Sequence, residues 1–196
     1  SRNAQAALAK EYGISGFCYY HYWFNGRQVL ETPVREILAS GEPDFPFCLC
    51  WANENWTRNW DGEFKNVLLE QKYSHEDDLQ HIQFLFDYFK DERYIKVDGK
   101  PVFIVYRTEL FPDIKRTAEL WREEALKCGF KGLYLISCEN FKTNTPPEEM
   151  GFDASFNFFP NHYGMPLYVI PGKIETLLHK IGIKKSPYLS DLIWNY

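Results

Sequence analysis

Apolar runs of strand length alternate along this chain with segments whose apolar residues recur at helical spacing. The strand-like runs are residues 14–24, 45–51, 101–106, 133–138 and 154–158. Helical spacing marks residues 3–12, a segment that opens at Thr32-Pro33 and closes at Gly41, residues 74–90, residues 114–125 and, more weakly, residues 173–181. Near-continuous apolar strands alternating with helices predict a parallel sheet covered by helices.

The number of strand–helix units sets the expected architecture. A closed (β/α)₈ barrel needs eight units, about five are present, and the first element is a helix with no strand before it. We therefore expect an α/β fold, a (β/α)₈ TIM-barrel-like domain that occupies residues 1–196 and is incomplete, with the first strand and the last units absent. An open doubly wound sheet is the alternative. No Gly-rich phosphate loop follows any strand, which argues against a nucleotide-binding version of that sheet.

Polar and aromatic residues follow each predicted strand. They occupy residues 19–25, 51–56, 106–107, 138–140 and 158–162. In a parallel α/β barrel the active site lies at the carboxyl ends of the strands. The recurrence at every strand end therefore predicts a site at this rim.

Residues 48–62 carry the strongest chemical signal. Three tryptophans alternate there with amides, an arginine and two carboxylates. A pyranose ring offers one patch of C–H bonds for stacking on an aromatic face and a rim of hydroxyls for hydrogen bonds. This composition indicates a carbohydrate-active protein.

Three carboxylates are candidate catalytic groups: Glu54, Glu139 and Asp61. Glu54 has tryptophans on both sides, and apolar walls disfavour an ionised carboxylate, as a general acid requires. The alternative for Glu54 is a surface ion pair with Arg58. Glu139 holds the equivalent place on another strand, as a second carboxylate or a hydroxyl acceptor. Asp61 fits an ordinary Asp-Gly turn equally well.

The candidate substrate-binding residues share a place at the strand ends. They are Tyr20, His21, Tyr22, Trp23, Trp51, Asn53, Trp56, Arg58, Trp60, Tyr106, Arg107 and Asn140. Some have structural alternatives. His21 could be a hydrogen-bonded structural residue, and Arg107 could pair with Glu109 or Glu139 instead of clamping an anion. Trp51 is expected to be the most buried tryptophan of the group.

The remaining histidines and the cysteines give little indication of a catalytic or metal-binding role. His75 and His81 are expected at the surface of the helix at residues 74–90. The five cysteines, four of them in strand-like runs, indicate reduced, buried thiols in a cytoplasmic protein. Cys48 and Cys50 lack a second pair with zinc-like spacing, so we expect no metal site and no cofactor.

Composition excludes several partners. The formal net charge is −5 and aromatic residues make up 18% of the chain. The acidic balance argues against nucleic acid or an anionic membrane surface as partner. No apolar run approaches the ~20 residues of a membrane-spanning helix, and residues 3–10 have a helical pattern in place of a signal peptide.

Three long motifs resemble a known family. Residues 16–26, 43–62 and 94–107 are similar to the WbsX-type, glycoside hydrolase family 99-like domain, and the likeness runs to about residue 160. The resemblance implies a barrel, an oligosaccharide or polysaccharide substrate, and a role in bacterial surface polysaccharides of the O-antigen or rhamnan type. A transfer reaction would add an activated donor such as a nucleotide-sugar, for which the sequence shows no phosphate-binding signature apart from Arg58 and Arg107. The related glycosidases cleave internal α-mannosidic bonds with retention, using two carboxylates.

The chain also departs from that family. The Glu-Trp-x-Glu catalytic motif of the glycosidases is absent, as are the opening Tyr-x-Pro-Gln-Phe-His-like and closing Trp-Asp-Asn-like motifs of WbsX-type proteins. Three hypotheses therefore stand: an enzyme that makes or cleaves glycosidic bonds, a non-catalytic glycan-binding or scaffold domain, and a fragment without independent function.

Overall fold

The structure is a computed structural model that describes residues 1–58, 63–139 and 145–158, with residues 177 and 183. Residues 1–157 form one compact unit, and residues 158–196 are grouped as a second. Trp60, Asp61, Asn140 and nearly all of the predicted helix at residues 173–181 lie outside the described residues.

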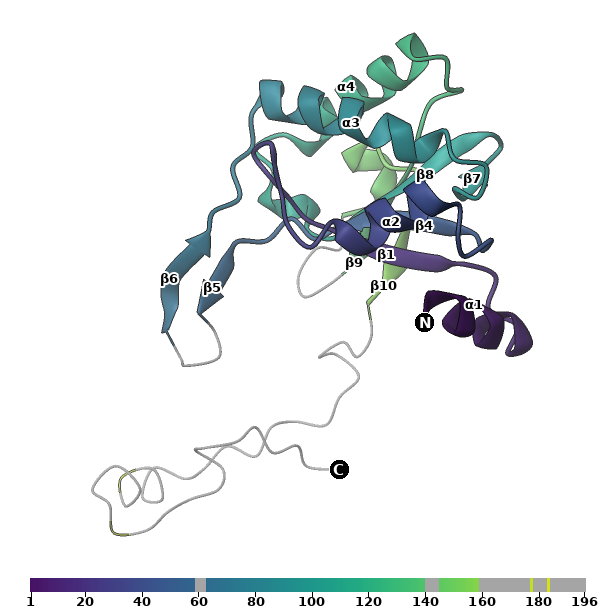
Figure 1. The fold of residues 1–196 in the computed structure, drawn as a ribbon. Coiled ribbons are helices and arrows are strands. Elements are labelled where there is room, and N and C mark those ends of the chain that lie inside the picture. The colour runs from purple at the N-terminus through teal and green to yellow at the C-terminus, as the bar shows by residue number, and fades with distance from the viewer. Residues whose placement is uncertain (59–62, 140–144, 159–176, 178–182, 184–196) are drawn as a thin grey trace. The chain divides into compact units, whose positions relative to one another are not determined.

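A parallel sheet forms the centre of the first unit (Figure 1). Its strands run in sequential order, β1-β4-β8-β9-β10, all parallel, and the short β7 pairs antiparallel with β8. The strands are β1 (Phe17–His21), β4 (Phe47–Trp51), β7 (Lys96–Val97), β8 (Lys100–Val105), β9 (Tyr134–Glu139) and β10 (Ala154–Asn157). The predicted mixed α/β fold with a parallel sheet is confirmed. Within the described residues the sheet is open, with β1 and β10 at its edges.

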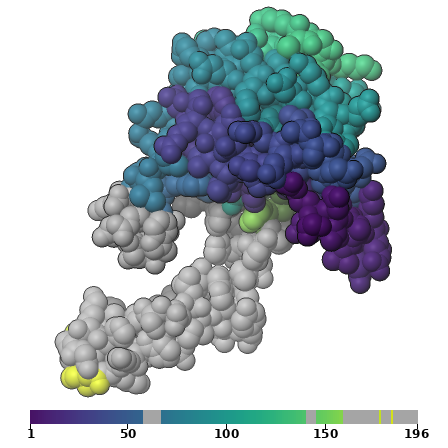
Figure 2. Space-filling view, viewed as in Figure 1, coloured from purple at the N-terminus to yellow at the C-terminus, as the bar shows by residue number. Residues whose placement is uncertain are grey.

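Helices α2 (Thr32–Ser40), α3 (His75–Phe89) and α4 (Ile114–Lys127) connect successive strands of the sheet. All three lie on the same side of it (Figure 1), and the α2 and α3 regions form a continuous surface there (Figure 2). Helix α1 (Arg2–Glu11) precedes β1. Short 3₁₀ turns occupy Thr108–Leu110 and Pro147–Met150. The strand order does not reverse, as it would in a doubly wound sheet.

Helix ends follow the sequence signals with one exception. The Ser74 hydroxyl accepts a hydrogen bond from the Asp77 backbone at 3.1 Å and caps α3. Gly41 ends α2 in the left-handed conformation, at φ 71°. Thr32, a residue type that often caps helices, lies inside α2 instead, and Glu31 takes the cap position without a side-chain hydrogen bond. The rigid Pro33 in the first turn still fixes where α2 starts.

The core lies between the sheet and the helix layer. Each strand turns alternate residues toward the helices, and register partners such as Leu49 and Phe103 share that face. Trp121 of α4 is fully buried against this face, with its ring centroid 5.5 Å from that of Phe103. Losing a core tryptophan of this kind typically costs about 3–5 kcal/mol.

Two small antiparallel hairpins extend from the carboxyl side of the sheet. One joins β2 (Trp23–Phe24) to β3 (Arg27–Gln28), and the other joins β5 (Trp56–Arg58) to β6 (Glu63–Leu69). The second projects away from the sheet (Figure 1). The sequence did not predict it, because its polar residues break the alternation that marks a strand.

Candidate functional site

A cavity of about 590 Å³ lies where β1 and β4 end. Its walls come from the residues that follow those strands, from the end of β8 and from the β5–β6 hairpin. The lining residues are Tyr20, Tyr22, Ala52, Glu54, Asn55, Trp56, Thr57, Leu68 and Tyr106. Because parallel strands bring their carboxyl ends to one edge of the sheet, side chains distant in sequence meet here.

Four aromatic rings form a connected row along this cavity. The Tyr106 ring lies edge-on to Tyr20, with centroids 6.3 Å apart, and Tyr20 lies 6.3 Å from Tyr22. Tyr22 in turn lies 5.3 Å from Trp56, again edge-on. A row of rings offers flat apolar area with polar tips, which suits stacking against sugar rings.

The hydroxyls of Tyr20 and Tyr22 in this row stay protonated. Burial raises the pKa of Tyr20 to about 12 and also raises the pKa of Tyr22. A protonated phenol both donates and accepts a hydrogen bond. The row therefore offers neutral hydrogen-bonding groups beside its apolar faces.

Glu54 brings charge to the cavity and is paired with an arginine. The Arg107 guanidinium donates from Nη1 to Glu54 and from Nε to Glu109. An arginine stays protonated at every relevant pH, so this contact places a full positive charge beside the Glu54 carboxylate. The Glu54 side chain is 42% exposed, and its described partner is Arg107, in place of the apolar surroundings expected for a general acid.

Asn53 joins the end of β4 to the end of β8. Its side-chain amide donates to the Arg107 carbonyl at 2.7 Å and accepts from the Arg107 N–H at 2.8 Å. The amide also donates to the Tyr73 hydroxyl at 2.9 Å, which donates back to the Asn53 carbonyl at 2.8 Å. Asn53 is fully buried, so these bonds hold the backbone beside Glu54 and do not face the cavity.

His21 lies beneath the site, on the helix side of the sheet. Its Nε2 is 2.9 Å from Nε2 of His81, which stacks on the Trp23 ring. Burial lowers the pKa of His21 to about 3 and that of His81 far below its usual range, so both are neutral. The surface position expected for His81 is wrong, since its side chain is fully buried; His75 is exposed.

Trp23 and Trp51 are also interior residues. The Trp23 indole donates to Asp77 at 2.9 Å, and the Trp51 indole donates to the Trp23 carbonyl at 3.2 Å. Trp51 is fully buried, as expected. The structure thus brings Tyr20, Tyr22, Glu54, Trp56 and Tyr106 to the cavity, whereas His21, Trp23, Trp51 and Asn53 support it from within.

Three of the remaining candidates have described positions. Glu139 lies at the end of β9, where the Ser155 hydroxyl donates to it, and it is not among the residues that line the cavity. Arg58 ends β5, and Arg107 stands behind Glu54. The lining residues that were not among the predicted site residues are Ala52, Asn55, Thr57 and Leu68, and the last two belong to the hairpin that was not predicted.

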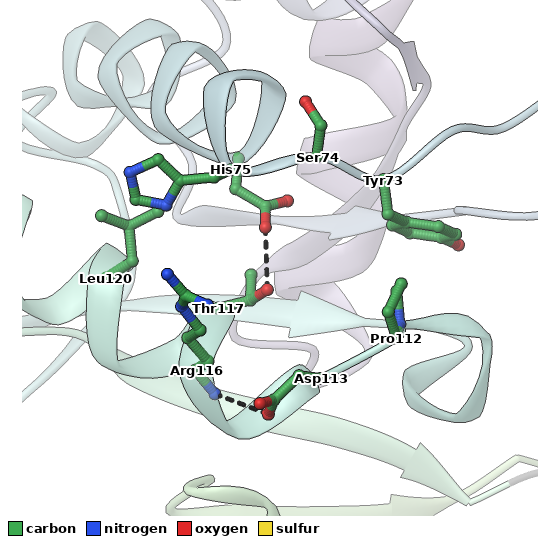
Figure 3. A pocket seen from close by; sticks show the side chains of 9 residues that line it. Tyr73, Ser74, His75, Pro112, Asp113, Arg116, Thr117 and Leu120 are labelled. Atoms are coloured by element: carbon green, nitrogen blue, oxygen red, sulfur yellow. Dashed lines mark hydrogen bonds between the residues drawn. The ribbon is translucent and has the colours of Figure 1, made fainter.

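A smaller cavity of about 200 Å³ lies between the first turns of α3 and α4 (Figure 3). The Thr117 hydroxyl donates to the buried Asp78 carboxylate at 2.8 Å, and burial raises the pKa of Asp78 to about 6. His75 and Arg116 line the same space. Helix N-termini and Arg116 favour an anion, whereas Asp78 disfavours one. These opposed charges define no single class of ligand.

Within the described residues, no three His, Cys, Asp or Glu side chains are grouped so that they could hold a metal ion. All five cysteines are free thiols. None of the helices that the structure describes has the length and hydropathy needed to cross a membrane.

Comparison with known proteins bears on this site. The family model described as "Glycosyltransferase WbsX" matches residues 1–189. The chain belongs to the WbsX glycosyltransferase family. Two relatives, each called "Uncharacterized protein WxcX" and from two strains of Xanthomonas campestris pv. campestris, are 41% identical to this chain over 157 residues. That match covers 80% of this chain and 22% of each relative, so the chain spans about a fifth of their length.

A solved structure of a "Glycoside hydrolase-like protein" is similar to this WbsX-family chain with a TM-score of 0.47 and 16% sequence identity. The similarity covers 91% of this chain and 53% of that protein.

Proposed function

We propose that this WbsX-family chain binds an oligosaccharide in the strand-end cavity and acts on a glycosidic bond there, with Glu54 as the catalytic carboxylate. One observation carries the proposal: the aromatic row from Tyr106 to Trp56 lies beside Glu54 in one cavity at the carboxyl ends of the strands. Stacking faces, neutral hydroxyls and a carboxylate are the groups that glycan chemistry requires.

We also propose that residues 1–196 belong to an incomplete (β/α)₈ barrel. Sequentially ordered parallel strands with α2, α3 and α4 on one side are the arrangement from which such a barrel is built. An open sheet edge at β1 and at β10 then marks where further units would pair.

The contact with Arg107 favours a particular role for Glu54. Glycosidic bond cleavage passes through a positively charged, oxocarbenium-like transition state. An ionised carboxylate stabilises that charge or attacks the anomeric carbon, while a second carboxyl group protonates the leaving oxygen. Glu139 and Asp61 are the candidates for the second group. A retaining reaction requires the two carboxyl groups to lie about 5–5.5 Å apart.

The acceptor decides whether the reaction is transfer or hydrolysis. A sugar hydroxyl gives a new glycosidic bond, and water gives hydrolysis. Membership of a family described as glycosyltransferases supports transfer. We further propose that the reaction belongs to bacterial surface polysaccharide metabolism in the cytoplasm, with O-antigen or rhamnan as the polymer, as the resemblance of the three sequence motifs implies.

A non-catalytic glycan-binding domain is the second candidate. It is favoured by one observation: among the described residues that line the cavity, Glu54 is the sole carboxylate. Such a domain would keep the aromatic row and would not need Glu54 for turnover.

Substitution of Glu54→Gln separates the two functions. The variant keeps the shape and removes the charge, and Glu92→Gln, at an exposed site after α3, is the matched control. Calorimetry would measure binding of mannose- and rhamnose-type oligosaccharides, and product analysis would measure transfer or cleavage. Retained binding with turnover reduced about 10³-fold or more supports the enzyme. Unchanged turnover removes Glu54 from the chemistry. Binding without turnover in the unsubstituted chain supports the binding domain.

A further inference from the structure

Among the described residues that line the strand-end cavity, Glu54 is the charged one. The other described lining residues are aromatic, apolar or neutral polar groups, and the protonated hydroxyls of Tyr20 and Tyr22 add no charge. Of these described groups, the one carboxylate that a ligand in the aromatic row meets is Glu54. The chain as a whole carries a formal charge of −5, which adds no attraction for an anion.

Arg107 is the cation nearest to this carboxylate in the described contacts, and two of its side-chain nitrogens are engaged. Nη1 donates to Glu54 and Nε donates to Glu109, so two carboxylates share one guanidinium. Its backbone is held on both sides by the Asn53 amide. Arginine recognises a phosphate or carboxylate ligand through the same donors, and here two carboxylates already offset its positive charge.

We infer that the cavity selects uncharged sugar units and disfavours acidic sugars and nucleotide diphosphate-sugars. The inference rests on the proposed function, since it concerns the ligand of the same site. It assigns Glu109 a specificity role: by holding Arg107, Glu109 keeps the guanidinium from binding an anion in the ligand.

The expected size of the selection follows from the charges. Two like charges about 5 Å apart repel each other, and the repulsion is stronger in a partly buried site than in open water. An acidic ligand should therefore bind about tenfold more weakly than its neutral counterpart. The difference should shrink as salt is raised, because salt screens exposed charges.

Calorimetry on the full chain tests this selection with matched ligands. The probes are an α-linked mannose oligosaccharide, the same oligosaccharide oxidised to mannuronate, a rhamnose oligosaccharide and GDP-mannose. Tight binding of the neutral probes, with both anionic probes at least about tenfold weaker, supports the inference. Anionic probes that bind as tightly as the neutral ones overturn it and leave the proposed function intact. Failure of every probe to bind overturns the proposed function and this inference with it.

Glu109→Gln provides the second test, because it frees one edge of Arg107 without changing the aromatic row. The variant should bind the mannuronate probe about three- to tenfold more tightly than the unsubstituted chain does, with binding of the neutral probe unchanged. Glu92→Gln, which removes the same charge at a distant exposed site, controls for net charge. Equal gains in both variants, or no gain in either, would contradict a specificity role for Glu109.

Discussion

Trp56 and Glu54 contribute different properties to the same cavity. Trp56 provides contact area, and Glu54 provides charge. The indole lies edge-on to Tyr22 and Phe24 and lines the cavity beside the carboxylate. The half-buried ring contributes these two edge-on contacts to the fold and offers its remaining area to a ligand in the cavity. Its removal should therefore affect ligand binding more than folding.

We predict that Trp56→Ala weakens oligosaccharide binding by about 1–2 kcal/mol, which is roughly five- to thirtyfold in Kd. Tyr12→Ala is the control, because Tyr12 is an exposed aromatic side chain of the α1 end and lies outside this cavity. Calorimetry of both variants with one neutral oligosaccharide gives the comparison. Equal losses in the two variants would show that Trp56 is not a stacking surface.

The neutral pair of His21 and His81 should make stability depend on pH. Burial lowers both pKa values below the usual value near 6.5, so the unfolded chain binds protons more readily than the native chain as pH falls below that value. The stabilisation is complete above about pH 6.5 and decreases by about 1.4 kcal/mol per pH unit for each histidine below it. Asp77 and Asp78, on α3 beside the pair, have raised pKa values and act in the opposite direction.

Comparison with the double variant His21→Leu and His81→Leu isolates this effect from the carboxylates. Urea unfolding between pH 5 and 7.5 should show a clearly shallower pH dependence in the variant. Parallel pH profiles would mean that the two histidines are protonated alike in the folded and unfolded states.

At the scale of elements, Asn53 is the residue that fixes β4 against β8 at the rim. Asn53→Ala would leave the Tyr73 hydroxyl and both backbone groups of Arg107 without these partners in a buried place. We expect a loss of about 2–4 kcal/mol in the free energy of unfolding. Asn3→Ala, exposed on α1, should change it by less than about 0.5 kcal/mol. A small loss in chemical denaturation of Asn53→Ala would contradict the role of the rim contact.

The elements themselves were largely predictable from the sequence. Helical and strand periods identified α1 to α4 and the five parallel strands to within a few residues, because each buries a regular apolar face. The β5–β6 hairpin was not predicted, because it has no such face. His81 was expected at the surface because the helical pattern was traced through apolar residues alone. In the structure the neutral His81 side chain packs against the rings of Trp23 and Trp51.

At the scale of the whole molecule, the position of the site was predictable and its internal contacts were not. Polar and aromatic residues at the strand ends pointed to the right rim, since parallel strands bring those ends together. The pairing of Glu54 with Arg107 joins residues 53 positions apart and depends on how β4 and β8 align. No local pattern encodes such a contact, so the ion pair of Glu54 with Arg107 could be found only from the fold.

The most direct test of the account is a crystal structure of the chain soaked with mannose- and rhamnose-type oligosaccharides. We predict sugar rings stacked along the row from Tyr106 to Trp56, with a glycosidic oxygen or anomeric carbon within reach of Glu54 and a second carboxyl group. Sugar bound elsewhere, for example between the first turns of α3 and α4, would contradict the proposed site. An empty strand-end cavity at saturating ligand would contradict it equally.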